Sequence, residues 1–325
     1  MTMFKTPRFW YKIKYYDYPF VTILSVFSIL YYTAYLSVKA CKKYLGKQVK
    51  LQSKTICVGN VVMGGSGKTP VCIALAKLTI KQGLKPCFLT KGYGRSKKGF
   101  FSLTPQSNPY EYGDEAVLLS NYAPTFVYSS IKDLQVFNSK GFDVVIMDDG
   151  LHGMKVKCET TILTWDGMLD YKNKLLFPAG PFRALSLNIK HHANIILLPK
   201  DNLVINPEFF NKMQNKFMAQ TSIAIPKSIF EKKVIAFCGL ARHQKFYSSL
   251  EQKGIELTKT INFADHYRYS IDDVQKLETL TEQNTVITTY KDFVKIKYIL
   301  PNTKIIPIEL ECNIDETLPF NFLSD

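Results

Sequence analysis

The chain has 325 residues, 46% of them hydrophobic, which is enough to bury a sizeable core and makes two domains the natural expectation. Its formal net charge of +15 favours a negatively charged partner, such as nucleic acid, an anionic lipid surface or a phosphorylated substrate. The lysines are scattered, and neither a dense basic helix with interleaved aromatics nor zinc-finger spacing occurs, so no nucleic-acid partner is expected. The seven cysteines include no Cys-x-x-Cys pair, which argues for reduced, buried thiols and against a disulfide framework.

The N-terminal segment is uncharged from Phe20 to Val38, a stretch of about 28 Å as a helix, close to the thickness of the hydrocarbon core. We therefore predict a membrane-associated helix within residues 1–38. A cleaved signal peptide is disfavoured because no small-residue cleavage pattern follows. Three alternatives stay open: a transmembrane anchor, an interfacial helix and an ordinary buried helix of a soluble domain. The interfacial helix is supported by a weakly polar stripe at helical spacing, formed by Thr22, Ser25, Ser28, Thr33 and Ser37.

A glycine-rich loop follows the first predicted strand of the main body. Thr55–Val58 is expected to be a strand and Thr69–Gly83 a helix that ends at a glycine cap. A strand, a glycine loop and a helix start in this order cradle nucleotide phosphates on backbone N–H groups, which predicts ATP and Mg²⁺ as ligands. Lys68 would reach the β/γ-phosphates and the Thr69 hydroxyl would bind Mg²⁺. Val62 stands where the usual pattern has a further glycine. The predicted cofactor-binding residues are Gly64, Gly65, Ser66, Gly67, Lys68 and Thr69.

The rest of the chain alternates predicted strands and helices. This alternation predicts an α/β fold, with a P-loop NTPase-like doubly wound parallel sheet in residues 39–230 and a second, smaller α/β domain in 231–325. Residues 200–230 show no regular pattern. The strands expected in the first domain are Pro86–Thr90, Thr125–Tyr128, Val144–Met147, Thr160–Thr164 and Ile195–Leu198, with helices at Tyr112–Tyr122 and Ile131–Lys140. Those expected in the second are Val234–Phe237, Thr285–Thr288 and Lys304–Ile308, with helices about His243–Lys253 and Ile271–Leu280.

Two pairs of acids could carry chemistry. Asp148 and Asp149 follow an apolar strand. In proteins with a phosphate loop, the carboxylate that holds Mg²⁺ also follows such a strand. A pair of acids that only caps a turn before Gly150 would have the same pattern. Asp114 and Glu115 begin a predicted helix, where negative charge is favourable in any protein. Phosphoryl transfer to an alcohol also needs a carboxylate that orients or deprotonates the hydroxyl, and it can use a further metal ligand.

Basic and histidine side chains add weaker candidates. Lys91–Arg95 contains two glycines and follows a predicted strand. It is either a turn with solvated basic side chains or a segment that contacts a phosphate or a substrate headgroup. Arg183 follows a Pro-Ala-Gly-Pro loop and could stabilise transferred charge. His266 follows Asp265, a dipeptide that is more often structural than catalytic. His191-His192 has no helix-spaced partner and is expected at the surface.

Taken together and in order, these segments resemble the tetraacyldisaccharide 4′-kinases, the lipid A 4′-kinase family of Gram-negative bacteria. The Thr69-Pro70 pair, the Pro178–Pro181 loop and an uncharged helix ahead of the phosphate loop are distinctive. The matching segments are Val58–Asn60 leading into Gly64–Pro70, Gly92–Arg95, Gly113–Glu115, Asp148–Leu151, Pro178–Pro181 with Arg183, Phe263–His266 with Ser270, and Thr289–Lys295.

The resemblance implies ATP-dependent phosphorylation of the 4′-hydroxyl of an acylated glucosamine disaccharide 1-phosphate, giving lipid IVA at the cytoplasmic face of the bacterial inner membrane. It implies two α/β domains with the site in the cleft between them. Asp114 would be the base and His266 its supporting partner from the second domain. From the physics of phosphoryl transfer we also expect domain closure to bring His266 toward Asp114 and to exclude water. Thr69 and Glu115 would lie at Mg²⁺, and Asp148 and Asp149 would organise the metal, water and neighbouring side chains.

The chain departs from the family pattern at several motifs. His152-Gly153 replaces Gln-His after Asp-Asp-Gly-Leu, and Ala116 replaces the proline after Gly-Asp-Glu. Tyr267 and Tyr290 replace a second histidine and a glutamate. Because each change spares the residues assigned chemistry, an active enzyme is expected. Two rival functions remain on the residues alone: a membrane-anchored P-loop ATPase or switch that acts through protein partners, and a nucleic-acid-binding ATPase suggested only by charge.

Overall fold

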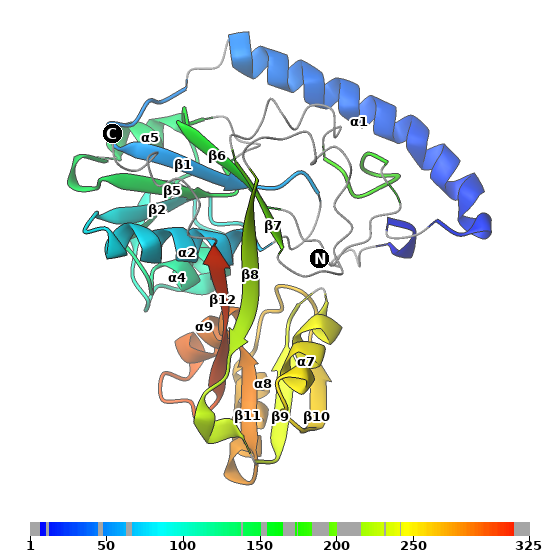
Figure 1. Ribbon diagram of the computed structural model, residues 1–325, viewed down its shortest axis with the longest axis vertical. Coiled ribbons are helices and arrows are strands. Elements are labelled where there is room, and N and C mark those ends of the chain that lie inside the picture. The colour runs from blue at the N-terminus through cyan, green and yellow to red at the C-terminus, as the bar shows by residue number, and fades with distance from the viewer. Residues whose placement is uncertain are drawn as a thin grey trace. The chain divides into compact units, whose positions relative to one another are not determined.

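The computed structural model describes residues 7–10, 13–44, 48–62, 67–137, 139–150, 155–164, 173, 175–183, 195–199, 216–230, 232–240 and 242–314. Within them the chain forms two compact units. Figure 1 labels the main helices and strands and colours them from the N-terminus to the C-terminus. Unit 1 is built from Phe88–Ser129 and Thr221–Cys312, and unit 2 from Lys5–Cys87 and Ser130–Gln220, with the C-terminal residues beyond Cys312. The domain boundary expected near residue 230 stays a prediction.

Unit 2 contains a parallel sheet around β1 (Lys54–Gly59), which lies between β5 (Val144–Asp148) and β6 (Thr160–Thr164). β6 also pairs in parallel with β7 (Ile195–Pro199), which pairs with the first residues of β8 (Lys216–Ala224). β1 and β5 are apolar and almost wholly buried, as expected for strands of a parallel sheet. α2 (Lys68–Lys81) packs against both of these strands and buries one run of its side chains there.

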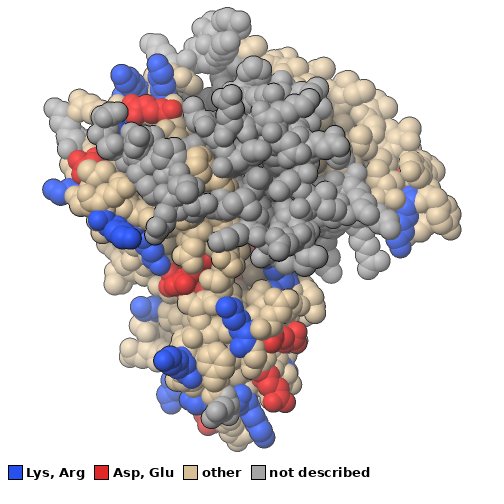
Figure 2. Space-filling model, viewed as in Figure 1, with Lys and Arg blue, Asp and Glu red and all other residues tan. Residues whose placement is uncertain are grey.

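The N-terminal part of unit 2 is helical. Two 3₁₀ turns, Arg8–Trp10 and Tyr15–Asp17, precede α1 (Tyr18–Tyr44). The segment Tyr15–Val38 is long and apolar enough to cross a membrane, and most of it is exposed. On the face shown in Figure 2, the described surface of α1 is almost entirely tan, that is, formed by residues other than Lys, Arg, Asp and Glu. In the sequence, Lys39, Lys42 and Lys43 lie at the C-terminal end of α1. Unit 2 also contains α5 (Ile131–Val136), followed by a 3₁₀ turn at Ser139–Gly141.

Unit 1 contains a second parallel sheet, in the order β10 (Leu257–Asn262), β9 (Val234–Cys238), β11 (Thr285–Thr289) and β12 (Ile306–Ile314). Two apolar clusters fill it, one around Ala236, Cys238 and Leu250 and the other around Phe237, Val274 and Ile296. Because neighbouring residues of β9 point into different clusters, each face of this sheet has its own core. The helices are α7 (His243–Gln252), α8 (Ile271–Thr279) and α9 (Tyr290–Ile299), with 3₁₀ turns at Lys227–Ile229 and Leu280–Glu282.

The remaining part of unit 1 joins short elements to the end of β2 (Pro86–Thr90). β4 (Thr125–Val127) pairs in parallel with β2, and β3 (Phe101–Leu103) pairs antiparallel with β4. α3 (Pro109–Tyr112) and α4 (Asp114–Leu119) lie between β3 and β4 in the chain, and both pack against α9. The start of α4 and the first turn of α9 therefore lie close together.

The predicted α/β fold with parallel strands and an N-terminal apolar helix is confirmed, while several elements differ. The helix expected over Tyr112–Tyr122 is two helices broken at Gly113, where φ is 98°. The helix expected over Ile131–Lys140 ends at Val136. β8 lies within the stretch expected to be irregular, and β3, β10 and α9 were not predicted. The sequence pattern did not predict β10 because most of its side chains are polar and partly or fully exposed, as is usual for an edge strand.

Candidate active site

Unit 2 contains the residues of the predicted phosphate-binding site. Gly64, Gly65 and Ser66 lie outside the described residues, so the structure begins again at Gly67. Gly67 caps the N-terminus of α2 with φ of 73°, a left-handed conformation that favours glycine. The following helix presents Lys68 and Thr69 in its first turn, where backbone N–H groups have no partner within the helix.

Strand pairing brings the second acidic pair to this helix. Val58 on β1 is the parallel partner of Asp148 on β5, so the carboxyl ends of the two strands lie side by side. Thr69 Oγ1 donates a hydrogen bond to Asp148 Oδ2 at 3.1 Å. Burial raises the pKa of Asp148, and the positive charge of Lys68 opposes that rise. Lys68 Nζ lies 3.4 Å from Oδ1 of the fully buried Asn60.

The next acid connects this pair to the arginine loop. Asp149 has φ of 56°, an uncommon conformation for a residue other than glycine and one that clusters at functional sites. Its Oδ1 lies 3.8 Å from Lys68 Nζ, and its Oδ2 lies 4.0 Å from Arg183 Nη1. Unit 2 therefore gathers two cations and two carboxylates next to the phosphate loop, with each residue in the region where its motif placed it.

Unit 1 contains a cluster of acidic residues whose position depends on a close approach of two glycines. Gly92, which follows β2, has φ of 62°, and a Cβ there would lie 2.3 Å from the Tyr112 carbonyl oxygen. Gly113 has φ of 98°, and a Cβ there would lie 3.0 Å from Gly92 Cα. Side chains at either position would separate the two segments. The glycines thus fix the N-terminus of α4, and with it Asp114, beyond the carboxyl end of β2.

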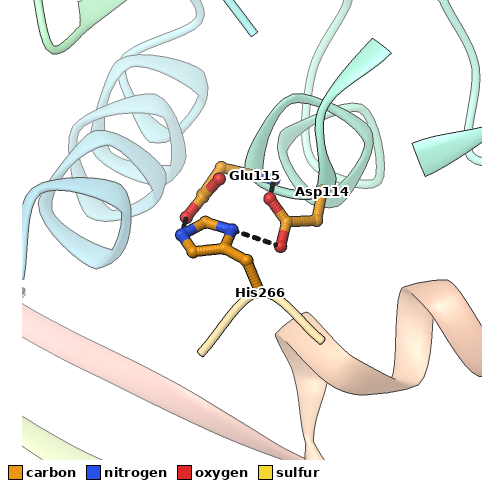
Figure 3. A group of neighbouring side chains, drawn as sticks. All are labelled: Asp114, Glu115 and His266. Carbon is orange, nitrogen blue, oxygen red and sulfur yellow. Dashed lines mark hydrogen bonds and ion pairs between the residues drawn. The ribbon is translucent and has the colours of Figure 1, made fainter. Parts of the chain in front are cut away.

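Asp114, Glu115 and His266 form one cluster (Figure 3). His266 Nδ1 donates to Asp114 Oδ2 at 2.9 Å, and His266 Nε2 lies 3.7 Å from Glu115 Oε1. The imidazole reaches between the two carboxyl groups at the start of α4 (Figure 3). His266 has φ of 54°. This histidine and Asp149 are the non-glycine residues with positive φ among those the structure describes.

Two lysines of α9 complete the cluster. Lys291 Nζ donates to Glu115 Oε1 at 2.7 Å and lies 3.1 Å from His266 Nε2. The imidazole tautomer protonated at Nδ1 satisfies both contacts, because Nδ1–H donates to Asp114 while Nε2 accepts from Lys291. Lys295 is 2% exposed, and its Nζ lies 2.8 Å from Asp292 Oδ1 and 4.0 Å from Asp114 Oδ2. Buried charges of both signs therefore balance one another around Asp114.

These contacts move the pKa values of the cluster in different directions. Burial alone would raise the pKa of Asp114, but the His266 hydrogen bond, the contact with Glu115 and the charge of Lys291 hold it well below its usual range. Burial raises the pKa of Glu115 to about 7, with the charge of Lys291 opposing the rise. Burial would lower the pKa of Lys291, yet the neighbouring carboxylates raise it. Burial would lower the pKa of the His266 imidazole, but the hydrogen bond to Asp114 raises it, and the net result is a raised pKa.

Each of the two units contains oxygen ligands of the type that Mg²⁺ prefers. In unit 2, the Thr69 hydroxyl is already in contact with a carboxylate oxygen of Asp148. In unit 1, the candidate ligand atoms of Asp114, Glu115 and His266 lie within 4.8 Å of one another. Glu115 Oε2 is buried without a hydrogen-bond partner among the residues that the structure describes. The donor sets present therefore fit a magnesium ion.

The structure also differs from one mechanistic expectation. Domain closure was expected to bring His266 toward Asp114, but both residues belong to unit 1 and are already hydrogen-bonded. Sequence reasoning missed Lys291 and Lys295 as members of the site. Both lie in the Thr289–Lys295 motif, which was the available signal. His152, His191 and His192 lie outside the described residues.

The fold and these side chains define an α/β phosphotransferase with a P-loop-like nucleotide site. The family model for tetraacyldisaccharide-1-P 4′-kinase matches residues 20–324, and the chain belongs to this family. The membership confirms the sequence-based prediction of a kinase of lipid A biosynthesis. It favours this function over the protein-partner switch and the nucleic-acid ATPase.

Relatives agree with this assignment, and a solved structure has a similar fold. The chain is 30% identical over 312 residues to tetraacyldisaccharide 4′-kinase of Rickettsia typhi, covering 95% of this chain and 94% of the relative. It is 35% identical over 248 residues to that of Paramagnetospirillum magneticum, covering 74% and 76%. The crystal structure of LpxK from Aquifex aeolicus in complex with ATP has a similar fold, with a TM-score of 0.77 and 24% identity, covering 94% of this chain and 98% of that one.

Proposed function

We propose that the chain transfers the γ-phosphate of ATP to the 4′-hydroxyl of an acylated glucosamine disaccharide 1-phosphate, with Asp114 as the base. The observation that carries this proposal is the 2.9 Å hydrogen bond between His266 Nδ1 and Asp114 Oδ2. The imidazole donates a hydrogen bond to one oxygen of the Asp114 carboxylate and so fixes the orientation of that carboxylate. The same contacts keep Asp114 ionised at neutral pH, so its carboxylate can accept a hydrogen bond from the hydroxyl and orient it. The proton would pass to Asp114 only as the bond to phosphorus forms and the hydroxyl becomes acidic.

The donor half of the reaction falls to unit 2. Lys68 would contact the β/γ-phosphates, and Arg183, near Asp149, would contact charge that develops on the transferred group. In unit 2, Thr69 and Asp148 would hold Mg²⁺, and Asp149 would orient Lys68 and Arg183. In unit 1, Glu115 offers a further carboxylate that could hold a metal ion. When bound, the metal would neutralise charge on the phosphate oxygens.

An exposed aromatic ring lies next to the proposed base. The Tyr93 side chain is 77% exposed, and its ring centroid lies 5.6 Å from that of His266. Because Tyr93 belongs to the glycine-rich segment after β2, it can contact a sugar ring that approaches Asp114. This placement supports a headgroup-contacting function for Gly92–Arg95.

We further propose that α1 lies on the cytoplasmic face of the inner membrane and does not cross it. Ser28, near the middle of the uncharged stretch, hydrogen-bonds to the Leu176 carbonyl at 2.8 Å. The middle of a spanning helix would lie about 15 Å from either surface of the hydrocarbon core, where an irregular loop facing lipid is not tolerated. The outward side of α1 supplies an apolar face for membrane contact, including Phe20, Ile23, Val26, Phe27, Ile29 and Leu30.

The proposal is tested by following label from γ-labelled ATP into lipid. Purified protein is incubated with vesicles that contain the disaccharide 1-phosphate, with and without Mg²⁺. The proposal requires labelled lipid that appears only when both the disaccharide lipid and Mg²⁺ are present. The label must also be retained when mild acid removes the acid-labile 1-phosphate. Release of labelled inorganic phosphate at the same rate without the lipid would contradict it.

A further inference from the structure

The proline-containing loop before Arg183 is a tight hairpin of unit 2. Phe177 N donates to the Phe182 carbonyl at 2.8 Å, and Phe182 N donates to the Leu175 carbonyl at 3.2 Å. A Cβ on Gly180 would lie 2.2 Å from the Leu175 carbonyl oxygen, so the turn closes only around glycine. We refer to residues 175–182 as the proline hairpin. Its shape is set by its own backbone, but several polar groups at its tip need partners from elsewhere.

The N-terminal segment supplies those partners. Trp10 Nε1 donates to the Pro178 carbonyl at 2.9 Å, and the Trp10 ring packs edge-on against Phe177. Ser28 Oγ donates to the Leu176 carbonyl at 2.8 Å and accepts from Ala179 N at 3.1 Å. Asn173, itself 1% exposed, donates to the Phe9 and Ala179 carbonyls at 2.9 and 2.8 Å.

Ser28 differs from the other hydroxyls of α1. Thr22, Ser25 and Ser37 donate to carbonyls of their own helix, four residues back. Ser28 also lies 3.1 Å from such a carbonyl, but its shorter contact leaves the helix, and its side chain is 5% exposed. The residues of the polar stripe thus differ from one another. Ser28 is buried and binds the hairpin, whereas Thr22, Ser25 and Ser37 bond to their own helix.

The other end of the proline hairpin reaches the nucleotide site. Phe182 forms a bridge to Val62, and Arg183 N donates to the Val61 carbonyl at 2.8 Å. Val61 and Val62 are buried and lead directly into the phosphate loop. Arg183 Nη1 then lies 4.0 Å from Asp149 Oδ2. A continuous set of contacts therefore runs from α1, through the hairpin, to the cation beside Asp149.

We propose that Ser28 is a positioning residue for phosphate transfer: it holds the proline hairpin so that Arg183 points to the transferred phosphate. The helix that contacts the membrane is then also a structural part of the nucleotide site. This inference rests on the proposed function of Arg183. Misplacement of a catalytic group by about 1 Å can reduce a rate 100-fold, so loss of this anchor affects the chemical step.

The test compares Ser28→Ala with Ser28→Thr, which keeps the hydroxyl, and with Ser37→Ala, which removes an exposed hydroxyl of the same helix. Each variant is assayed for kcat, for KM of ATP and for sedimentation with vesicles of anionic lipid. Ser28→Ala is expected to lower kcat about tenfold while KM for ATP and vesicle binding stay unchanged. Ser28→Thr recovers most of kcat, and Ser37→Ala has the wild-type value.

A double-mutant cycle shows whether Ser28 acts through Arg183. In an Arg183→Lys background, Ser28→Ala is expected to cause little further loss of kcat, because the group that it positions is already altered. The same fractional loss in both backgrounds, or an unchanged kcat in Ser28→Ala, would overturn the inference. Full activity of Arg183→Lys with KM for ATP unchanged would instead refute the proposed function of Arg183.

Discussion

His266 donates a 2.9 Å hydrogen bond to Asp114 across 152 residues of sequence, and both belong to one compact unit. The left-handed backbone of His266 turns the imidazole toward the start of α4, where the two adjacent carboxyl groups lie. Lys291 contacts the other ring nitrogen, at 3.1 Å. The imidazole is thereby fixed at both nitrogens. The other oxygen of Asp114, Oδ1, accepts from the Glu115 backbone N–H at 3.1 Å and has a second lone pair that can accept a proton from substrate.

Replacing His266 by Gln is expected to lower kcat by about ten- to a hundredfold, because the carboxylate loses the contact that orients it. KM for ATP should stay unchanged, since His266 is assigned to orienting Asp114 and its contacts among the described residues do not include Lys68 or Thr69. Steady-state kinetics with varied ATP checks this prediction. His243→Gln, on α7, is the matched control and should behave as wild type. A fall in kcat of equal size in both variants would count against a specific function of His266.

Replacing Lys291 by Met is expected to move the ascending limb of the pH–rate profile to higher pH. The pKa of Glu115 is raised by burial to about 7, and the charge of Lys291 opposes the rise. Without that charge the carboxylate form is less favourable, so its pKa rises further and the ionised metal ligand forms only at higher pH. Profiles of kcat/KM across the neutral pH range, run beside the exposed Lys297→Met on the same helix, check the shift. A limb at the wild-type position would show that Lys291 does not act on this group.

Replacing Thr69 by Val should weaken the apparent affinity for Mg²⁺ by at least about tenfold, because the hydroxyl beside Asp148 is lost. Thr69→Ser keeps the hydroxyl and should remain near wild type. Titration of initial rate against Mg²⁺ at saturating ATP separates the two. Equal metal affinity in the valine and serine variants would place the metal elsewhere.

Replacing Gly92 by Ala should destabilise the protein by about 1–3 kcal/mol, because the new methyl group overlaps the Tyr112 carbonyl. Gly94 is the matched control, since it has a similar φ of 74° but a Cβ added there would meet no atom within 4 Å. Urea unfolding followed by circular dichroism measures both. A similar loss in Gly94→Ala would mean that backbone strain, and not the approach to α4, dominates.

The sequence allowed the local parts of the site to be predicted. Gly67, Lys68 and Thr69 lie within one turn of a helix start, and Asp148 follows its strand directly, so periodicity and motif order were enough. Parallel sheets bind ligands at the carboxyl ends of their strands, and this rule predicted that Asp148 lies near the phosphate loop. The pairing of Val58 with Asp148 agrees with that prediction.

Long-range contacts could not be predicted in the same way. The burial of Lys295 depends on how α9 packs against α3, α4 and α8, and a lysine in a polar motif gives no sign of it. Ser28 resembled its neighbours in the polar stripe, although it alone among the hydroxyls compared above binds the proline hairpin. Polar strands such as β10 have weak patterns because the sheet, and not their own side chains, stabilises them.

The measurement that tests the central claim most directly is phosphate transfer by Asp114→Asn. Label is followed from γ-labelled ATP into the disaccharide lipid, with ATP binding measured in parallel and Asp272→Asn, at the exposed start of α8, as the control. Loss of a general base predicts a fall in transfer of about 10²- to 10⁴-fold with ATP binding intact, while the control remains at the wild-type rate. Undiminished transfer by Asp114→Asn would contradict the assignment of Asp114 as the base.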